Sequence, residues 1–223
     1  MSIMTSFNYD IEISDYNMLN PEKLKMKDHY SINNSIVKII PIKDNKNNQN
    51  IFLLTPWTKI RKYCGIQNFN NSEINPKTFK IGFNEQDISH LNFINKIKEL
   101  DNYFSSDEFK HKYISKDFNG IYIPIYNNEI IKSKIDYDNE DNINTSIYKT
   151  FSFPDKPNVF YKKEVNINCH DDFKKNIRYG SNIRFVLVPT SVWYTQTQYG
   201  IKIKLIEIQV GTNKQPFDYT LFN

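Results

Sequence analysis

Residues 178–210 constrain the fold more than any other part of this 223-residue chain. They hold two runs, residues 183–188 and 201–210, in which β-branched and other apolar side chains dominate, as is typical of β-strands. A connector that contains Pro189 and Gly200 separates the two runs. We therefore expect a long closing hairpin in a mainly β protein.

The alternation of apolar side chains slips within the second run. Ile201, Ile203 and Leu205 share one face of an extended strand, whereas the apolar residues from Ile206 onward fall on the other. This slip predicts either a β-bulge near Leu205 or burial of both faces. The far half of the strand is then expected to close a barrel. Two lysines nearer the turn should stay available: Lys202 and Lys204.

Aromatic and cationic side chains are interleaved in the same stretch, with only Glu207 opposing the charge. This combination suits a single-stranded nucleic acid, because bases stack on rings and phosphates attract positive charge. The alternative is that the rings form the core of a β-barrel, and the alternation of a strand requires that some of them do. The candidates are Arg178, Arg184, Trp193, Tyr194, Tyr199, Lys202 and Lys204.

A second segment, residues 57–63, combines rings and cations in the same way. If it is extended, Trp57, Lys59, Arg61 and Tyr63 share one face, and Lys62 adds further charge. Such a face cannot form an apolar core, but it can stack bases, each contact contributing roughly 1–3 kcal/mol. The alternative is that the tryptophan is core and the cations form a solvated edge. We expect this segment to work together with the turn end of the closing hairpin.

The three arginines of the chain, Arg61, Arg178 and Arg184, all fall in these two segments. The chain has no alanine and is rich in Ile, Asn and Lys, which share A/T-rich codons, so we expect an A/T-rich genome in which lysine is a weak signal. Arginine is harder to dismiss, because it stacks on rings and contacts phosphates bidentately.

The remainder of the chain predicts several strands with a helix inserted midway. Strands are expected at residues 31–42, 51–54, 78–83, 121–126, 130–135, 148–153 and 159–165. The strand at 148–153 adds the candidates Lys149, Phe151 and Phe153. This order favours a small closed β-barrel of the OB-fold type over a doubly wound parallel sheet, because helices and strands alternate too rarely for the latter.

The clearest helical pattern is a stripe of apolar residues at three-residue spacing, with Asn84 as the expected cap and Asp87 in the first turn. A capping-box pattern at residues 105–108 predicts a second, short helix that brings in Phe109 and Tyr113. A third short turn or helix is expected at residues 170–180. The expected stripe consists of Ile88, Leu91, Phe93, Ile94, Ile97, Leu100 and Phe104.

Composition and motifs argue against several classes of protein. The net charge of +4 permits nucleic-acid binding without requiring it. No apolar run is long enough for a membrane span and no secretion signal is evident, which predicts an intracellular protein.

Cys64 and Cys169 are expected to be free, buried thiols. The acidic loop at 136–141 lacks the pattern of a calcium loop, and no catalytic motif appears. We expect no metal, no cofactor and no enzymatic activity.

Several motifs, taken in order, resemble the OB-fold single-stranded DNA-binding proteins of nucleocytoplasmic large DNA viruses, which are related in fold to the phage T7 type. They span most of residues 31–210. The motifs are Thr55-Pro56-Trp57, Tyr63-Cys64-Gly65-Ile66, the strand at 78–83, the helix end at 97–101, and Gly180, Trp193, Tyr199-Gly200 and Lys204-Leu205 in the closing stretch.

The resemblance implies sequence-independent binding of single-stranded DNA, or of RNA, in viral DNA replication, recombination or repair, in the host cytoplasm or nucleus. It places an OB-fold domain at residues 31–210, after an N-terminal extension (1–30) and before a tail (211–223). That tail has one acidic residue, unlike the acidic tail through which the T7 type contacts replication proteins. The alternative function is a non-catalytic structural or protein-interaction barrel of a large DNA virus.

Overall fold

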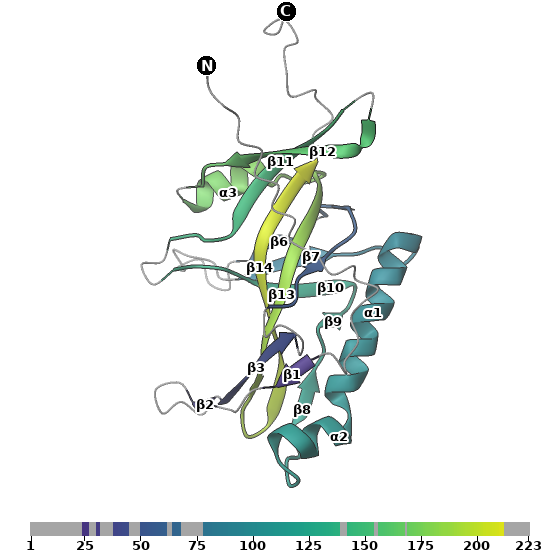
Figure 1. Ribbon diagram of the computed structural model, residues 1–223, viewed down its shortest axis with the longest axis vertical. Coiled ribbons are helices and arrows are strands. Elements are labelled where there is room, and N and C mark those ends of the chain that lie inside the picture. The colour runs from purple at the N-terminus through teal and green to yellow at the C-terminus, as the bar shows by residue number, and fades with distance from the viewer. Residues whose placement is uncertain are drawn as a thin grey trace, which may run out of the picture.

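A single long hairpin organises the structure, a computed structural model that describes residues 24–26, 30–31, 38–44, 50–61, 64–67, 78–138, 142–153, 156–167 and 169–211. Its strands are β13 (Asn182–Tyr194) and β14 (Gln198–Gly211). Residues 195–197 connect them, and the Thr195 amide donates to the Gln198 carbonyl at 2.8 Å. Figure 1 shows this hairpin running through the molecule with shorter strands on both sides.

Each edge of the hairpin pairs with three further strands. The edge of β13 takes β5 (Thr58–Lys59), β4 (Leu53–Leu54) and β3 (Lys38–Asp44), all antiparallel. The edge of β14 takes β8 (Ile121–Ile123), β10 (Ile130–Ile135) and β11 (Ser146–Phe153), all parallel. The outer strands are β1 (Leu24–Met26) and β2 (Tyr30–Ser31) on β3, β6 (Gly65–Gln67) on β7 (Thr78–Gly82), β7 and β9 (Tyr126–Asn127) on β10, and β12 (Lys156–Val165) on β11.

The predicted bulge in the second run is confirmed. Val186 pairs with Glu207 and the next residue, Leu187, pairs with Leu205, so Ile206 is the extra residue of β14. The bulge returns the apolar side chains after it to the same face as those before it, and Leu205 and Ile208 are both inaccessible to solvent. The hairpin thereby keeps one face on the core, and the alternative expectation also holds beside the bulge, because Val186 and Gln209 are buried on the other face.

The connector predicted at 189–200 is wrong in extent, because both strands continue through most of it. Pro189 pairs with Ile203 and Ser191 pairs with Lys202, which leaves Thr190 as the extra residue of a second irregularity. Proline has no amide hydrogen to give to a ladder, and a bulge is where a strand tolerates it. This irregularity again exchanges the faces of β13, so that Val192 is core and Trp193 is not.

Most predicted strands are confirmed, and the hairpin partner of residues 148–153 is indeed β12. The turn at Asn127–Asn128 is displaced by one residue, with Asn128 (φ 51°) and Glu129 (φ 61°) in the left-handed region that two-residue hairpin turns favour. Both cysteines are free, but the prediction that they are buried is wrong: Cys64 is half-buried and Cys169 is exposed.

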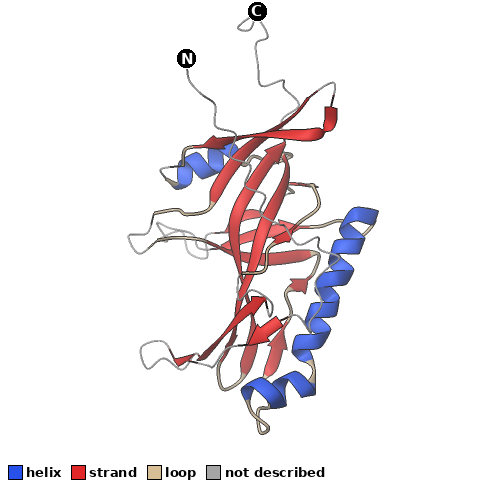
Figure 2. Cartoon of the chain, viewed as in Figure 1, coloured by secondary structure: helices blue, strands red, loops and turns tan. Residues whose placement is uncertain are grey.

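The main helix, α1 (Ile88–Ser105), packs along one side of the sheet (Figure 2). Its cap is Asp87, whose carboxylate accepts from the amides of Ser89 and His90, so the prediction of Asn84 was wrong. The apolar stripe is also wrong at its start, because Ile88 is 77% exposed and Leu91 37% exposed. Figure 2 also shows the other helical segments, which are α2 (Asp107–Phe109), η3 (Lys110–Ile114) and α3 (His170–Asn176).

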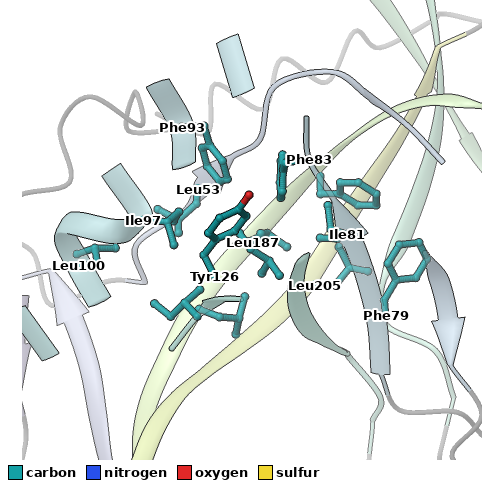
Figure 3. Close-up of a cluster of buried hydrophobic side chains, with 14 of the residues drawn as sticks. Leu53, Phe79, Ile81, Phe83, Phe93, Ile97, Leu100, Tyr126, Leu187 and Leu205 are labelled. Carbon is teal, nitrogen blue, oxygen red and sulfur yellow. The ribbon is translucent and has the colours of Figure 1, made fainter. Parts of the chain in front are cut away.

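The core lies between α1 and one face of the sheet. Figure 3 shows Phe93, Ile97 and Leu100 from the helix directed at the buried side chains of β7, β9 and the long hairpin. The predicted short helix caps on Ser106, whose hydroxyl accepts from the Phe109 amide at 3.1 Å. Phe109 is buried and Tyr113 half-buried, as expected.

The mainly β class with few helices is confirmed, whereas closure of a barrel is not observed. In the part of the chain that the structure describes, the strand order β1-β3-β13-β14-β10-β7-β6 runs from one edge to another without returning. The sheet also begins before residue 31, with β1 and β2. Most of the expected N-terminal extension and the tail after Gly211 lie outside the described residues.

Candidate nucleic-acid interface

The two faces of the hairpin separate the predicted rings. Tyr199 and Tyr194 lie on the core face; Tyr199 has no exposed surface, and its hydroxyl donates to the Phe104 carbonyl at 2.8 Å. Burial raises the pKa of Tyr199 to about 12. Both tyrosines were candidates for stacking on bases, and this placement corrects that prediction: they are core residues. Trp193 lies on the other face, which we call the outer face and which also carries Lys202, Gln209 and Arg184.

Trp193 is half-buried and borders a groove of about 310 Å³. The groove opens where β10 and β14 diverge, since these strands pair only through Lys134–Lys204 and Ile135–Leu205. Its walls come from β7 and β9, which pair with β10, and from β8, which pairs with β14. The polar and aromatic lining consists of Lys80, Asn127, Asn128, Lys132 and Trp193, and the apolar lining includes Ile123, Pro124 and Ile130.

Two lysines that line this groove lie side by side on adjacent strands. Lys80 of β7 and Lys132 of β10 are register partners, so their side chains leave the sheet on the same side. Among the described residues neither forms an ion pair, and Lys132 is exposed. Like charges directly opposite each other are unfavourable, and an anion bound between them would remove that repulsion.

The lysines of β14 next to this groove differ in their availability. Lys202 is exposed and forms no ion pair within the described part of the chain. Lys204 instead pairs with Asp136, its Nζ lying 2.5 Å from Oδ1. The prediction that both stay available therefore holds for Lys202, while Lys204 is already neutralised. Lys134, beside Lys204 in the ladder, donates to the Thr78 hydroxyl at 3.2 Å.

The two segments that contain the arginines lie side by side at the open end of the hairpin. The Ile60 amide donates to the Ser181 carbonyl at 3.0 Å, and the Gly180 amide donates to the Ile60 carbonyl at 2.9 Å. The predicted alternation is confirmed for residues 57–61, because Thr58 and Ile60 are buried while Lys59 is exposed. Lys62 and Tyr63 lie outside the described residues.

This open end is remote from the turn end, which corrects the expectation that the 57–63 segment works beside the turn. A Cβ on Gly211 would lie 3.4 Å from the Trp57 ring, whereas Trp193 is paired with Gly200. Residues 184 and 193 of β13 are nine positions apart, which corresponds to about 30 Å of strand. The outer face therefore carries two separate aromatic and cationic clusters.

Trp57 and Arg184 form the centre of the open-end cluster. The guanidinium carbon of Arg184 lies 4.8 Å from the ring centroid of Trp57, and Arg184 Nε donates to Gln209 Oε1 at 2.5 Å. The backbone carbonyl of Trp57 is hydrogen-bonded to His90 Nε2 at 2.8 Å, which ties this loop to α1. Partial burial lowers the pKa of Arg184. The guanidinium of Arg184 is thus already engaged by Trp57 and Gln209, and these contacts hold the Trp57 ring in place.

The network continues from Arg184 across the sheet. Gln209 donates through Nε2 to Glu207, whose Oε1 also accepts from Lys162 Nζ at 2.7 Å. Lys162 in turn lies 5.3 Å from the centroid of the Tyr148 ring. Gln209 has no exposed surface, and a buried amide is stabilising only when its hydrogen bonds are made.

The remaining predicted cations and rings are dispersed. Arg61 lies 3.7 Å from Glu129, with both side chains substantially exposed. Arg178 is exposed and donates through Nε to the Lys175 carbonyl at 3.0 Å. Lys149 pairs with the core residue Val210, so Lys149 and Phe151 project from the face opposite to Arg184. The side chain of Phe153 lies outside the described residues.

Sequence reasoning missed Lys80, Lys132 and the exposed Tyr179, which is 78% accessible. The lysines do occupy the polar positions of alternating strands, but only the register of β7 with β10 brings them together.

Among the described residues, no cluster of His, Cys, Asp and Glu could hold a metal ion, and no described helix is long and apolar enough to cross a membrane. Comparison with protein-family models and with curated proteins finds no match for this chain.

Proposed function

We propose that this chain is a sequence-independent single-stranded DNA-binding protein whose outer face holds the strand. The observation that carries the proposal is the groove in which half-buried Trp193 meets the adjacent Lys80 and Lys132, neither of which forms an ion pair with a described residue. A ring beside cations is the arrangement that single strands need, since bases stack and phosphates are attracted to the charge. Lys202 adds a further exposed cation one step along the same face.

The motif order in the sequence supports placing the chain with the OB-fold single-stranded DNA-binding proteins of large DNA viruses. In this proposal the curved sheet around β13, β14, β10 and β7 corresponds to the OB barrel, and the protein acts without a cofactor in viral DNA replication, recombination or repair inside the host cell. RNA is a second proposed ligand, and replication proteins are proposed partners.

A titration of labelled oligo(dT) at two salt concentrations tests this function. Each phosphate contact on a single strand contributes about −0.7 to the slope of log affinity against log salt. The double variant Lys80→Ala/Lys132→Ala should therefore reduce the slope by about 1.4. The matched control, Lys116→Ala/Lys163→Ala, removes two exposed lysines outside the groove and should leave the slope nearly unchanged. Absence of binding at about 50 mM salt would reject the proposal.

A second function, protein interaction, is favoured by one observation. Strand β8 pairs with β14 and with no other described strand, and two of its side chains, Ile121 (69%) and Ile123 (40%), are exposed. Exposed apolar residues on a sheet edge are typical of sites that pair with another chain. Replacing Ile121 with Lys should abolish such an interaction and leave oligo(dT) binding intact.

A further inference from the structure

The groove at Trp193 has the dimensions and chemistry of a site for one nucleotide. Its volume, about 310 Å³, lies at the lower end of the range of about 300–1,000 Å³ for small-ligand sites. An open stacking platform would need a ring and charge alone. This site is instead hollowed between strands and has a ring, an apolar wall, cations and amide side chains around one space.

The ring side of the groove is set by Trp193 and Pro124. Gly200 permits the indole to lie across β14, because a Cβ there would fall 3.1 Å from Cζ2 and 3.2 Å from Cε2 of Trp193. Ile123 is the last residue of β8 and pairs with Gly200 of β14, and Pro124 follows it in the chain. A planar base between these groups would have an aromatic face on one side and an apolar wall near it, as bases in protein sites commonly do.

The polar groups of the groove fall into two kinds. Lys80 and Lys132 supply positive charge and no acceptor, which suits a phosphate. Asn127 and Asn128 are exposed at the β9–β10 turn, and each amide offers a donor beside an acceptor, which matches the edge of a base. Within the described part of the lining there is no carboxylate to repel a phosphate.

From this arrangement we infer that the groove takes a single nucleotide of the bound strand, with the base against Trp193 and the phosphate between Lys80 and Lys132. This inference rests on the proposed function and adds an insertion site to it. The amides of Asn127 and Asn128 read the base edge. Asparagine pairs bidentately with adenine, so the site prefers adenine within an otherwise sequence-independent interface.

Fluorescence of Trp193 tests the inference directly. The chain has two tryptophans, so the variant Trp57→Phe leaves Trp193 as the reporter, and Trp193→Phe is the reciprocal control. In Trp57→Phe, dAMP should change the fluorescence saturably, with deoxyadenosine binding at least about tenfold more weakly because it lacks the charge-assisted contacts. Inorganic phosphate should give no spectral change. The Trp193→Phe protein should not respond to dAMP.

Two variant pairs then assign the groups. Lys80→Ala/Lys132→Ala should bring dAMP down to the affinity of deoxyadenosine, whereas Lys116→Ala/Lys163→Ala should not. Asn127→Ala/Asn128→Ala should remove the preference for dAMP over dTMP. Equal binding of dAMP and dTMP by the parent protein would overturn the role of the amides.

The outcomes for the insertion site and for strand binding are distinguishable. Oligo(dT) binding without a response of Trp193 to dAMP would overturn the insertion site and leave the proposed function standing. A response to dAMP without oligonucleotide binding would overturn strand binding and retain the groove as a nucleotide site. A dAMP response unaffected by loss of both lysines would also overturn the inference.

Discussion

The indole of Trp193 lies against Gly200, its partner on the neighbouring strand, so closely that a Cβ at residue 200 would stand 3.1 Å from the ring. The same Cβ would also lie 3.1 Å from the backbone carbonyl oxygen of Ile123, which β-pairing holds in place. Gly200 therefore serves two close approaches at once: that of β8 to β14 and that of the indole to the sheet. The groove depends on both.

Replacing Gly200 with Ala should distort the groove. We expect a loss of about 1–3 kcal/mol in the free energy of unfolding, the usual cost of overpacking, and weaker binding of oligo(dT). Urea unfolding and a fluorescence titration measure the two effects. Gly211→Ala is the comparison on the same strand: its Cβ would meet neighbours at 3.3–3.4 Å, which is still tight but less so than at Gly200, so we expect a smaller loss of stability there. Equal effects of the two substitutions would contradict the role of Gly200.

Tyr199 is expected to respond to mutation as a core residue and not as a contact to the bound strand. Tyr199→Phe removes the hydroxyl that donates to the buried Phe104 carbonyl, which should cost about 1–3 kcal/mol of stability. Because Tyr199 has no exposed surface, oligonucleotide affinity should be unchanged. Urea unfolding and a titration with oligo(dT) check the two halves of the prediction. A large loss of affinity in a folded Tyr199→Phe protein would place this ring in the interface after all.

Arg184 should behave as a structural residue. Arg184→Lys retains the charge, but lysine cannot both cover the Trp57 ring and donate to Gln209 as the planar guanidinium does. We expect a stability loss of about 1.5–3 kcal/mol, the scale of one hydrogen bond to a charged group. The salt slope of oligo(dT) binding should stay the same. A reduced slope without a change in stability would instead make Arg184 a phosphate contact.

Patterns within one stretch of sequence predicted where the strands and a bulge lie, but they did not predict which strands pair with each other. The bulge at Ile206 could be predicted because a slip in two-residue alternation is visible within one strand. The strand at Ile130–Ile135 was likewise predicted with its observed bounds. The pairing of Lys80 with Lys132 joins residues far apart in the chain, and no alternation within either strand indicates which strand lies beside it.

Polar residues in the core caused the errors at the start of α1. His90 is buried there, with Nδ1 accepting from the Asn84 amide at 2.9 Å and Nε2 facing the Trp57 carbonyl. A sequence pattern that counts only apolar residues selects Ile88 and Leu91 for this face instead. The buried face at the start of α1 is set by the contact of His90 with the distant segment that carries Trp57, and a pattern within the helix does not indicate that contact.

Asp101 should make stability depend on pH in an unusual direction. The residue is buried, and its carboxylate accepts from Tyr122 Oη at 2.7 Å and from the amides of Ile125 and Tyr126. Burial raises its pKa above the ordinary 3.8, although these hydrogen bonds oppose the shift. A carboxyl with a higher pKa in the folded state stabilises the fold when protonated, and this contribution is lost as the pH rises through the raised value.

Asp101→Asn isolates this contribution, since the amide keeps an acceptor oxygen but does not titrate. The free energy of unfolding of the parent protein, minus that of the variant, should be largest below pH 3.8 and should decline as the pH rises. Asp87→Asn is the opposite control: hydrogen bonds, chiefly from Ser89, lower the pKa of this exposed carboxylate, so its contribution should fall as the pH falls. Urea unfolding over a pH series measures both, and a difference for Asp101 that grows with pH would contradict the assignment.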